Sequence, residues 1–172
     1  MKKIWLILTV GLLLTGCSKQ KAMETVTDVY MSPEQANKQQ IMLQLPQELS
    51  SPVLQNEEAG ALYLCDEYSV TVQTVPAGDL AETVHNVTGV EKENLQMLQT
   101  REGDTLRYQW VWAVNGENGI QVGRGCILDD GSYHYVLTAL ADEDSAWKMN
   151  KTWQEMFASF HLAEGEYIST GS

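Results

Sequence analysis

The chain has 172 residues, with 11 Lys+Arg against 23 Asp+Glu and a formal net charge of −12. This length fits one domain, or one domain with a tail, and excludes most multi-domain architectures. A hydrophobic fraction of 44% is too high for a disordered acidic chain, and the acidic balance argues against a nucleic-acid partner, which requires clustered Lys and Arg.

The N-terminal segment has the organisation of a bacterial export signal. A basic start at residues 1–3 precedes an apolar run at residues 4–14. A membrane-spanning helix needs about 20 apolar residues, so this run has the length of a signal-peptide core. The following motif LTGC, at residues 14–17, resembles the lipobox of bacterial lipoprotein precursors.

The lipobox resemblance implies a covalent lipid anchor. It implies that residues 1–16 are removed as a signal peptide and that the sulfur of Cys17 carries a diacylglyceryl group. Because two or more acyl chains hold a protein stably at a bilayer, we expect an extracytoplasmic protein, anchored to the bacterial cell membrane by lipid. The alternative is an ordinary secretory signal followed by a chance cysteine.

The remainder divides into a tether, one domain and a tail. Residues 17–40 comprise the lipidated cysteine and a polar stretch without periodicity, which predicts a flexible tether. Residues 41–162 mix strand and helix patterns and form the single α+β domain. Residues 163–172 are a C-terminal tail.

The first half of the domain is predicted to hold three strands and one helix. Residues 41–46 are an apolar run stopped by proline, which indicates the first strand. Two further strands flank residues 66–67, where apolar residues alternate with polar ones. Asp79 is placed to cap a helix that begins at Leu80, and Gly89 can end it in the left-handed conformation.

A meander of consecutive hairpins follows. Alternation predicts a long strand whose apolar face carries Trp110 and Trp112, with Arg107 on the opposite face. Residues 115–119 form the turn, residues 120–128 the partner strand and residues 132–140 another strand, which together make an antiparallel meander. We expect the two tryptophans to pack against the last helix.

The last element is predicted to be an amphipathic helix. Acidic residues 142–144 suit its first turn, and Asp144 or Ser145 can cap it. Its apolar stripe is expected to lie across the sheet and comprises Ala146, Met149, Trp153, Met156, Phe157 and Phe160. The fold class is therefore α+β, with an antiparallel meander packed against this C-terminal helix and one mid-chain helix.

The C-terminal part resembles that of Mog1/PsbP-like domains. The resemblance rests on a strand of the form Y-x-L-T, an acidic helix start and an aromatic-rich helix ending in SF, matched here by Tyr135, Leu137, Thr138, Trp153, Phe157, Ser159 and Phe160. It implies a Mog1/PsbP-like sandwich and a non-enzymatic binding or assembly role. It brings no catalytic residues with it.

Two cysteines remain once Cys17 is lipidated. Cys65 and Cys126 both lie on predicted strands of an exported domain, where oxidation can occur. We predict a disulfide between them, which closes a long loop and contributes about 4 kcal/mol in the chain-entropy model. The alternative is two buried free thiols.

Signatures of catalysis and metal binding are missing from the sequence. His85, His134 and His161 lie on different predicted elements without ligand spacing, so no metal site is predicted. The acidic groups at 129–130 and 142–144 lack the spacing of a calcium loop. No GxSxG elbow occurs, and no cofactor is predicted.

Aromatic residues are the remaining candidates for a binding surface. Tyr133, Tyr135 and Trp147 cannot all face the same core, and an exposed Tyr/Trp patch suits a carbohydrate, peptide or protein ligand. The alternative is ordinary partly buried sheet residues. We therefore expect a non-catalytic binding or assembly module of the cell envelope, with an unknown protein or small-molecule partner. The alternative functions are an extracytoplasmic hydrolase acting on envelope material and a structural accessory of a membrane complex.

Overall fold

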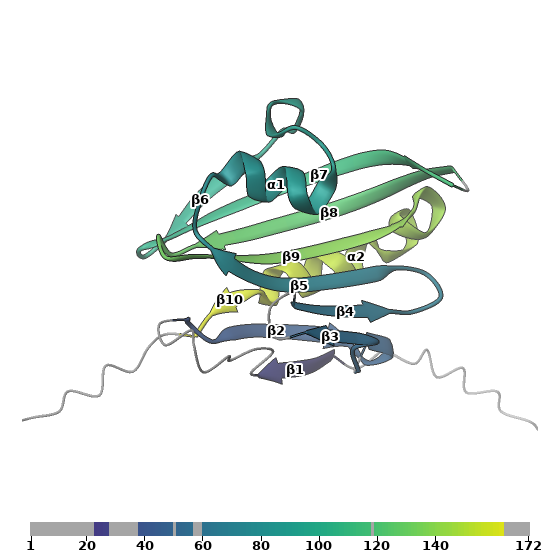
Figure 1. The fold of residues 1–172 in the computed structure, drawn as a ribbon. Coiled ribbons are helices and arrows are strands. Elements are labelled where there is room, and N and C mark those ends of the chain that lie inside the picture. Colours follow the sequence, from purple (N-terminus) through teal and green to yellow (C-terminus); the bar gives the residue numbers. More distant parts are fainter. Residues whose placement is uncertain (1–22, 28–37, 50, 57–59, 118, 164–172) are drawn as a thin grey trace, which may run out of the picture.

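A seven-stranded antiparallel sheet forms the centre of the fold (Figure 1). The computed structural model describes residues 23–27, 38–49, 51–56, 60–117 and 119–163. The strand order is β3-β4-β5-β9-β8-β7-β6. The strands are β3 (Leu54–Asn56), β4 (Gly60–Leu64), β5 (Ser69–Pro76), β6 (Leu98–Glu102), β7 (Thr105–Gly116), β8 (Gly119–Asp129) and β9 (Tyr133–Asp142).

The predicted meander corresponds to β7, β8 and β9. The β7–β8 hairpin is in register from Leu106↔Asp129 to Gly116↔Gly119, and β8 pairs with β9 along most of its length. The turn between β8 and β9 contains Gly131 at a φ of 83°, a conformation that glycine adopts without steric cost. This part of the fold is confirmed.

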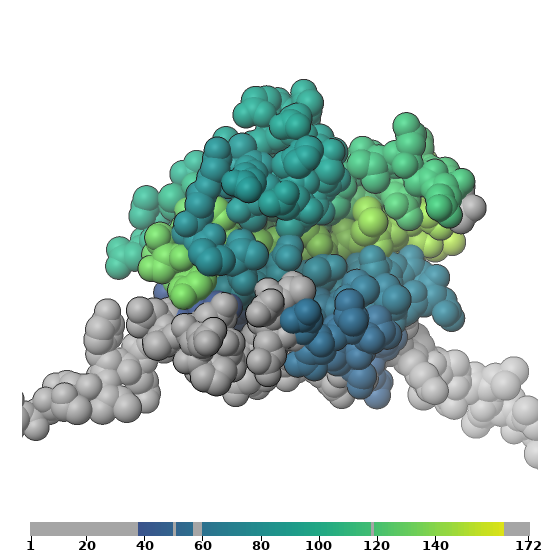
Figure 2. All heavy atoms as spheres, viewed as in Figure 1, coloured from purple at the N-terminus to yellow at the C-terminus, as the bar shows by residue number. Residues whose placement is uncertain are grey.

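The helix α1 (Leu80–Thr88) covers one face of the sheet (Figure 1). The Asp79 carboxylate accepts a hydrogen bond from the Ala81 amide, and Gly89 ends the helix at a φ of 70°, so both predicted caps are confirmed. A short 3-10 helix, η2 (Lys92–Asn94), follows. In the space-filling view, α1 and the loop after it rise as a ridge above the sheet (Figure 2).

Trp110 and Trp112 are buried under α1, together with Val84, Ile127 and Val136. Our expectation that they pack against the last helix is therefore wrong. The cause is the hairpin register, which places Trp110 opposite Gly125 and Trp112 opposite Gly123. Each indole lies on a glycine, and a Cβ added at either glycine would come within 2.3 Å of the ring. The glycines thus make room for the tryptophans on the α1 side of the sheet.

The helix α2 (Glu143–Ser159) packs against the opposite face (Figure 1). All six residues of the predicted stripe are buried, and they form one core with inward residues of β4, β5, β8 and β9. The helix begins after Asp142, whose side chain makes no capping hydrogen bond. It therefore begins earlier than a cap at Asp144 or Ser145 requires.

A smaller sheet lies beside α2. It has the order β1-β2-β10, from β1 (Met23–Thr27), β2 (Ile41–Pro46) and β10 (His161–Leu162). The strand β2 was predicted, and the 3-10 helix η1 (Gln47–Leu49) follows it. Residues 23–27, which we predicted to be part of a flexible tether, instead pair with β2. Antiparallel pairing satisfies backbone groups and does not depend on a side-chain pattern, so the polar sequence gave no sign of it.

Several predictions fall on residues outside the described part of the chain. These are the signal segment at residues 1–16, Cys17 and the tail from residue 164 onward. Within the described ranges, no helix is both long and apolar enough to cross a membrane.

Candidate functional site

A groove runs along α2, where the helix leaves part of the sheet uncovered. Its apolar end is a cavity of about 260 Å³ between α2 and the β7–β8 hairpin. The cavity is lined by Val111, Val122, Arg124, Glu143, Ala146, Trp147, Asn150 and Trp153. Val111 is 60% exposed and Trp147 is 75% exposed. Large apolar side chains held in water beside a cavity are typical of a binding surface.

Arg124 forms the polar edge of this cavity. It lies on β8 opposite Val111 of β7, and its guanidinium stands over the Phe157 ring at 5.1 Å from the centroid. Burial lowers the pKa of Arg124, although an arginine remains charged in proteins. Among the residues that the structure describes, Arg124 makes no ion pair. Along the described part of the groove, Arg124 is therefore a partly buried cation that no carboxylate pairs with directly.

Trp153 contributes a buried ring to the cavity wall. Its side chain lines the cavity, is 4% exposed and packs edge-on against Tyr68 at 6.1 Å between ring centroids. Its indole Nε1 has no hydrogen-bond partner within the described residues. The nitrogen is itself buried, so Trp153 lines the cavity through its ring and not through this N–H.

The groove becomes polar beyond Arg124. A broad hollow there is lined by Glu102, Arg107, Gln109, Arg124, Gln154, Ala158 and His161. Two of the three arginines in this acidic chain thus lie along one groove.

Arg107 itself is committed to the fold. It is buried and donates to the carbonyl oxygen of Phe160 at 2.7 Å and to that of Phe157, with Glu102 at 3.8 Å. These carbonyls belong to the end of α2, where a helix leaves backbone acceptors unpaired and favours a cation. Of the two arginines, Arg124 is therefore the one available to a ligand.

Comparisons with known proteins bear on the fold. No family model and no curated protein sequence matches the chain. Cyanobacterial PsbP from Synechocystis sp. PCC 6803 has a similar structure, with a TM-score of 0.53, 10% identity and coverage of 87% of this chain and 98% of that one. The chain has a Mog1/PsbP-like fold.

Two further structures are similar to this Mog1/PsbP-like chain. LpqN of Mycobacterium tuberculosis, described as involved in cell envelope biogenesis, gives a TM-score of 0.51 at 11% identity, covering 81% of this chain and 91% of its own. The Ran-binding protein Mog1p of Saccharomyces cerevisiae gives 0.46 at 12% identity, covering 83% and 97%. At these identities the likeness concerns the fold alone.

The predicted aromatic surface is not formed in this Mog1/PsbP-like structure. Tyr135 is fully buried, and its hydroxyl donates to Asp130 and accepts from the Gln39 amide, at 3.0 and 2.8 Å. Tyr133 lies beside it, at the start of β9, whereas Trp147 lies on α2, which begins after the end of that 10-residue strand. The prediction is wrong for Tyr135, because β9 is covered on both faces, and only Trp147 reaches the groove.

The predicted disulfide is absent, since Cys65 and Cys126 are free thiols. Cys65 directly follows β4, and β5 and β9 separate β4 from β8 in the sheet. Three strand spacings correspond to about 14 Å, whereas bridged cysteines have Cα atoms within about 7 Å. Burial raises the pKa of the Cys126 thiol to about 12. Strand order, which the sequence does not reveal, excludes the bridge.

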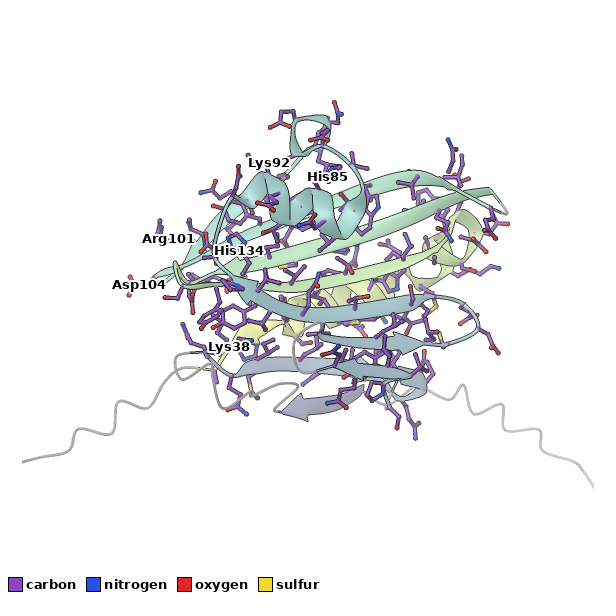
Figure 3. The ribbon with its side chains drawn as sticks, in the orientation of Figure 1. Lys38, His85, Lys92, Arg101, Asp104 and His134 are labelled. Carbon is purple, nitrogen blue, oxygen red and sulfur yellow. The ribbon has the colours of Figure 1, made fainter. Side chains whose placement is uncertain are left out.

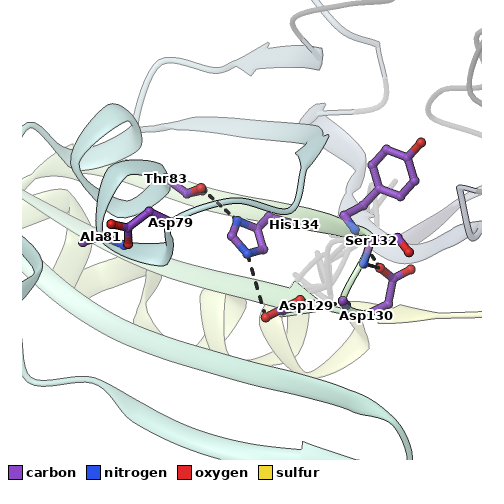
Figure 4. Close-up of polar contacts among 9 residues, drawn as sticks. Asp79, Ala81, Thr83, Asp129, Asp130, Ser132 and His134 are labelled. Atoms are coloured by element: carbon purple, nitrogen blue, oxygen red, sulfur yellow. Dashed lines mark hydrogen bonds and ion pairs between the residues drawn. The ribbon is translucent and has the colours of Figure 1, made fainter.

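The nearest approach to a catalytic grouping lies under α1. Thr83 Oγ1 is 2.8 Å from His134 Nδ1, and His134 Nε2 is 3.8 Å from Asp129 Oδ2 (Figure 4). His134 is only 1% exposed, so a substrate has no access to its ring, and the contact connects α1 to the sheet.

The histidines do not converge. His85 lies on α1 and His134 on the sheet below it (Figure 3), and His161 lies in β10. In the described part of the chain, no three His, Cys, Asp or Glu side chains cluster as metal ligands.

Proposed function

We propose that this protein is a lipid-anchored, extracytoplasmic module of the bacterial cell envelope that binds a partner in the groove along α2. The observation that carries the proposal is Arg124, a partly buried cation that makes no ion pair with any described residue, placed beside the exposed Trp147 and the apolar cavity. Such a combination of apolar area and one convergent charge is typical of binding sites. LpqN, which shares the fold, is described as involved in cell envelope biogenesis.

The anchor is the second part of the proposal. Cys17 follows the signal segment in a lipobox-like motif, and β1 begins at Met23. Six residue steps span at most about 20 Å. A lipid on Cys17 therefore keeps the small sheet, and with it the domain, close to the bilayer surface.

Lipid labelling tests the anchor. The full chain and its Cys17→Ser variant are expressed in a bacterium supplied with labelled palmitate, and processing and membrane partition are followed. We expect the native chain to be labelled and cleaved, and the variant to remain unlabelled and either uncleaved or released. Normal processing and labelling of the variant contradicts the anchor.

Crosslinking in the native envelope tests the groove. The native chain is compared with Trp147→Ala and Arg124→Gln, and with Arg101→Gln as a control of equal charge change, since Arg101 is exposed on β6 (Figure 3) and lines neither the cavity nor the polar hollow. We expect a reproducible crosslinked partner that both groove variants lose and the control keeps. If all four proteins give the same pattern, the groove is not the binding surface.

A further inference from the structure

The shape of the groove limits what it can bind, and this inference rests on the proposed binding function. Trp147 and Trp153 are six residues apart on α2, which is about 9 Å along the helix. The cavity of about 260 Å³ is smaller than the usual site for a drug-sized molecule. Its apolar part therefore has room for one large side chain, whereas a long acyl chain would extend onto the polar residues beyond Arg124.

The charges at the cavity favour a single carboxylate. Arg124 lines the cavity and supplies a forked donor that suits a carboxylate. Glu143 lines the same cavity, so a second negative charge on the ligand would be repelled. The strongly acidic chain also disfavours a polyanionic ligand.

The polar hollow beyond Arg124 suits a peptide backbone. Gln109 and Gln154 line it, and each amide side chain both donates and accepts hydrogen bonds. One groove thus offers an apolar compartment, a cation at its edge and amides beyond the cation. The C-terminal residue of a polypeptide has the same order of groups, namely a side chain, a carboxylate and a preceding peptide backbone.

We propose that the groove binds the free C-terminus of a polypeptide whose last residue is large and apolar. The carboxylate pairs with the guanidinium of Arg124. The last side chain lies in the cavity against Val111 and Trp147, and the preceding backbone lies along Gln109 and Gln154.

Calorimetry with defined peptides tests this proposal. The purified full chain, held in phosphatidylcholine nanodiscs, is titrated with acetylated Gly-Ser-Gly-Ala-Phe that ends in a free carboxylate, and with the same peptide ending in an amide. We expect the amide to bind at least tenfold more weakly. Arg124→Gln should weaken the free acid at least tenfold and leave the amide unchanged, Trp147→Ala should weaken both, and the control Arg101→Gln should change neither.

Each contrary outcome has a distinct meaning. Equal affinity for acid and amide overturns the C-terminal carboxylate, and tighter Arg124-dependent binding of dodecanoate identifies a lipid acid in place of a peptide. If no peptide binds while envelope crosslinking still depends on Arg124 and Trp147, this inference fails and the proposed function stands. If crosslinking is independent of both residues as well, the two proposals fail together.

Discussion

The two faces of the central sheet are built on different principles. The α1 face is a small closed core in which Trp110 and Trp112 lie on glycines. The α2 face carries the larger core but leaves the groove open at β7. Each face holds one buried indole Nε1 without a partner in the described structure, Trp110 under α1 and Trp153 at the cavity. One face is closed by its helix, and the other combines the larger core with an open groove.

Strand β7 serves both faces through its alternation. Its even-numbered residues, such as Trp110, enter the α1 core, and its odd-numbered residues, such as Arg107 and Val111, face α2 or the groove. A substitution in β7 or its partner β8 can therefore perturb one face and leave the other in place.

Removal of Arg107 is expected to have the largest effect. Arg107→Met deletes two charge-assisted hydrogen bonds to the end of α2, each worth about 1.5–3 kcal/mol, and should lower the free energy of unfolding by about 3 kcal/mol. Arg107→Lys should lose less, since lysine keeps the charge but lacks the fork. Urea unfolding measures both. Arg101→Met, in exposed β6, is the control, and an equal loss in both would contradict the capping role.

An alanine at Gly125 tests the closed face. Its Cβ would come within 2.3 Å of the Trp110 ring, and overpacking of this kind costs about 1–3 kcal/mol. We expect Gly125→Ala to lower the free energy of unfolding by about 2 kcal/mol, as measured by urea unfolding. Gly78→Ala, where a Cβ has no neighbour within 4 Å, should be neutral.

A double substitution separates the ring contact from other effects at Gly125. In Trp110→Leu the ring is gone, so the added methyl should cost less there than in the native chain. Additive losses would contradict the contact.

The hydrogen bond between α1 and the sheet is expected to contribute less to the free energy of unfolding than the contacts of Arg107 and Gly125. Thr83→Val removes the partner of His134 Nδ1 and should cost about 1–2 kcal/mol, the desolvation penalty of a buried polar group. Thr83→Ser keeps the hydroxyl and should stay closer to the native stability. Thr100→Val on exposed β6 controls for the change of residue type. If all three variants unfold at the same urea concentration, the contact does not hold α1.

The sequence predicted the elements better than their partners. The predictions of strand β7 from its alternation and of helix α2 from its apolar stripe were correct, because each pattern is a local consequence of burying one face of the element. Which helix covers Trp110 was not predictable, since both helices are amphipathic and only the register with Gly125 decides. In β4, Leu62 and Leu64 suggested the apolar alternation, yet Ala61 and Tyr63 are the buried residues, because the packing partner selects the face.

The groove was predictable only in part. Trp147 was identified as a candidate because it falls outside the apolar stripe of α2. Arg124 interrupts the apolar residues of β8 in the sequence, but nothing local shows that it would make no ion pair with the described residues. Arg107 contacts a helix end that lies 50 and 53 residues away in the sequence, and the cysteines are separated by strand order. Such non-local features arise from topology, which periodicity does not contain.

The turn between β8 and β9 supplies one carboxylate to each face of the sheet. Substitution of one of these carboxylates, Asp130, is expected to have the smallest effect on stability. Asp129 lies near His134 on the α1 side (Figure 4), and Asp130 accepts a hydrogen bond from the Tyr135 hydroxyl on the α2 side. Burial by itself raises the pKa of Asp130, but hydrogen bonds from the Tyr133 and Ser132 amides and the Tyr135 hydroxyl bring the pKa below its ordinary value of 3.8.

A depressed carboxyl pKa stabilises the fold above the unfolded-state pKa, and that stability is lost as the pH falls through the lower folded-state pKa. We therefore expect the native chain to lose stability between pH 5 and pH 3, and Asp130→Asn to lose less over the same interval. The difference should be below about 1 kcal/mol, because the carboxyl is partly exposed and screened. Urea unfolding at several pH values measures it, with Asp104→Asn in the exposed β6–β7 turn as the control. Parallel pH curves for the native chain and Asp130→Asn would show that the turn does not stabilise the α2 face through this carboxylate.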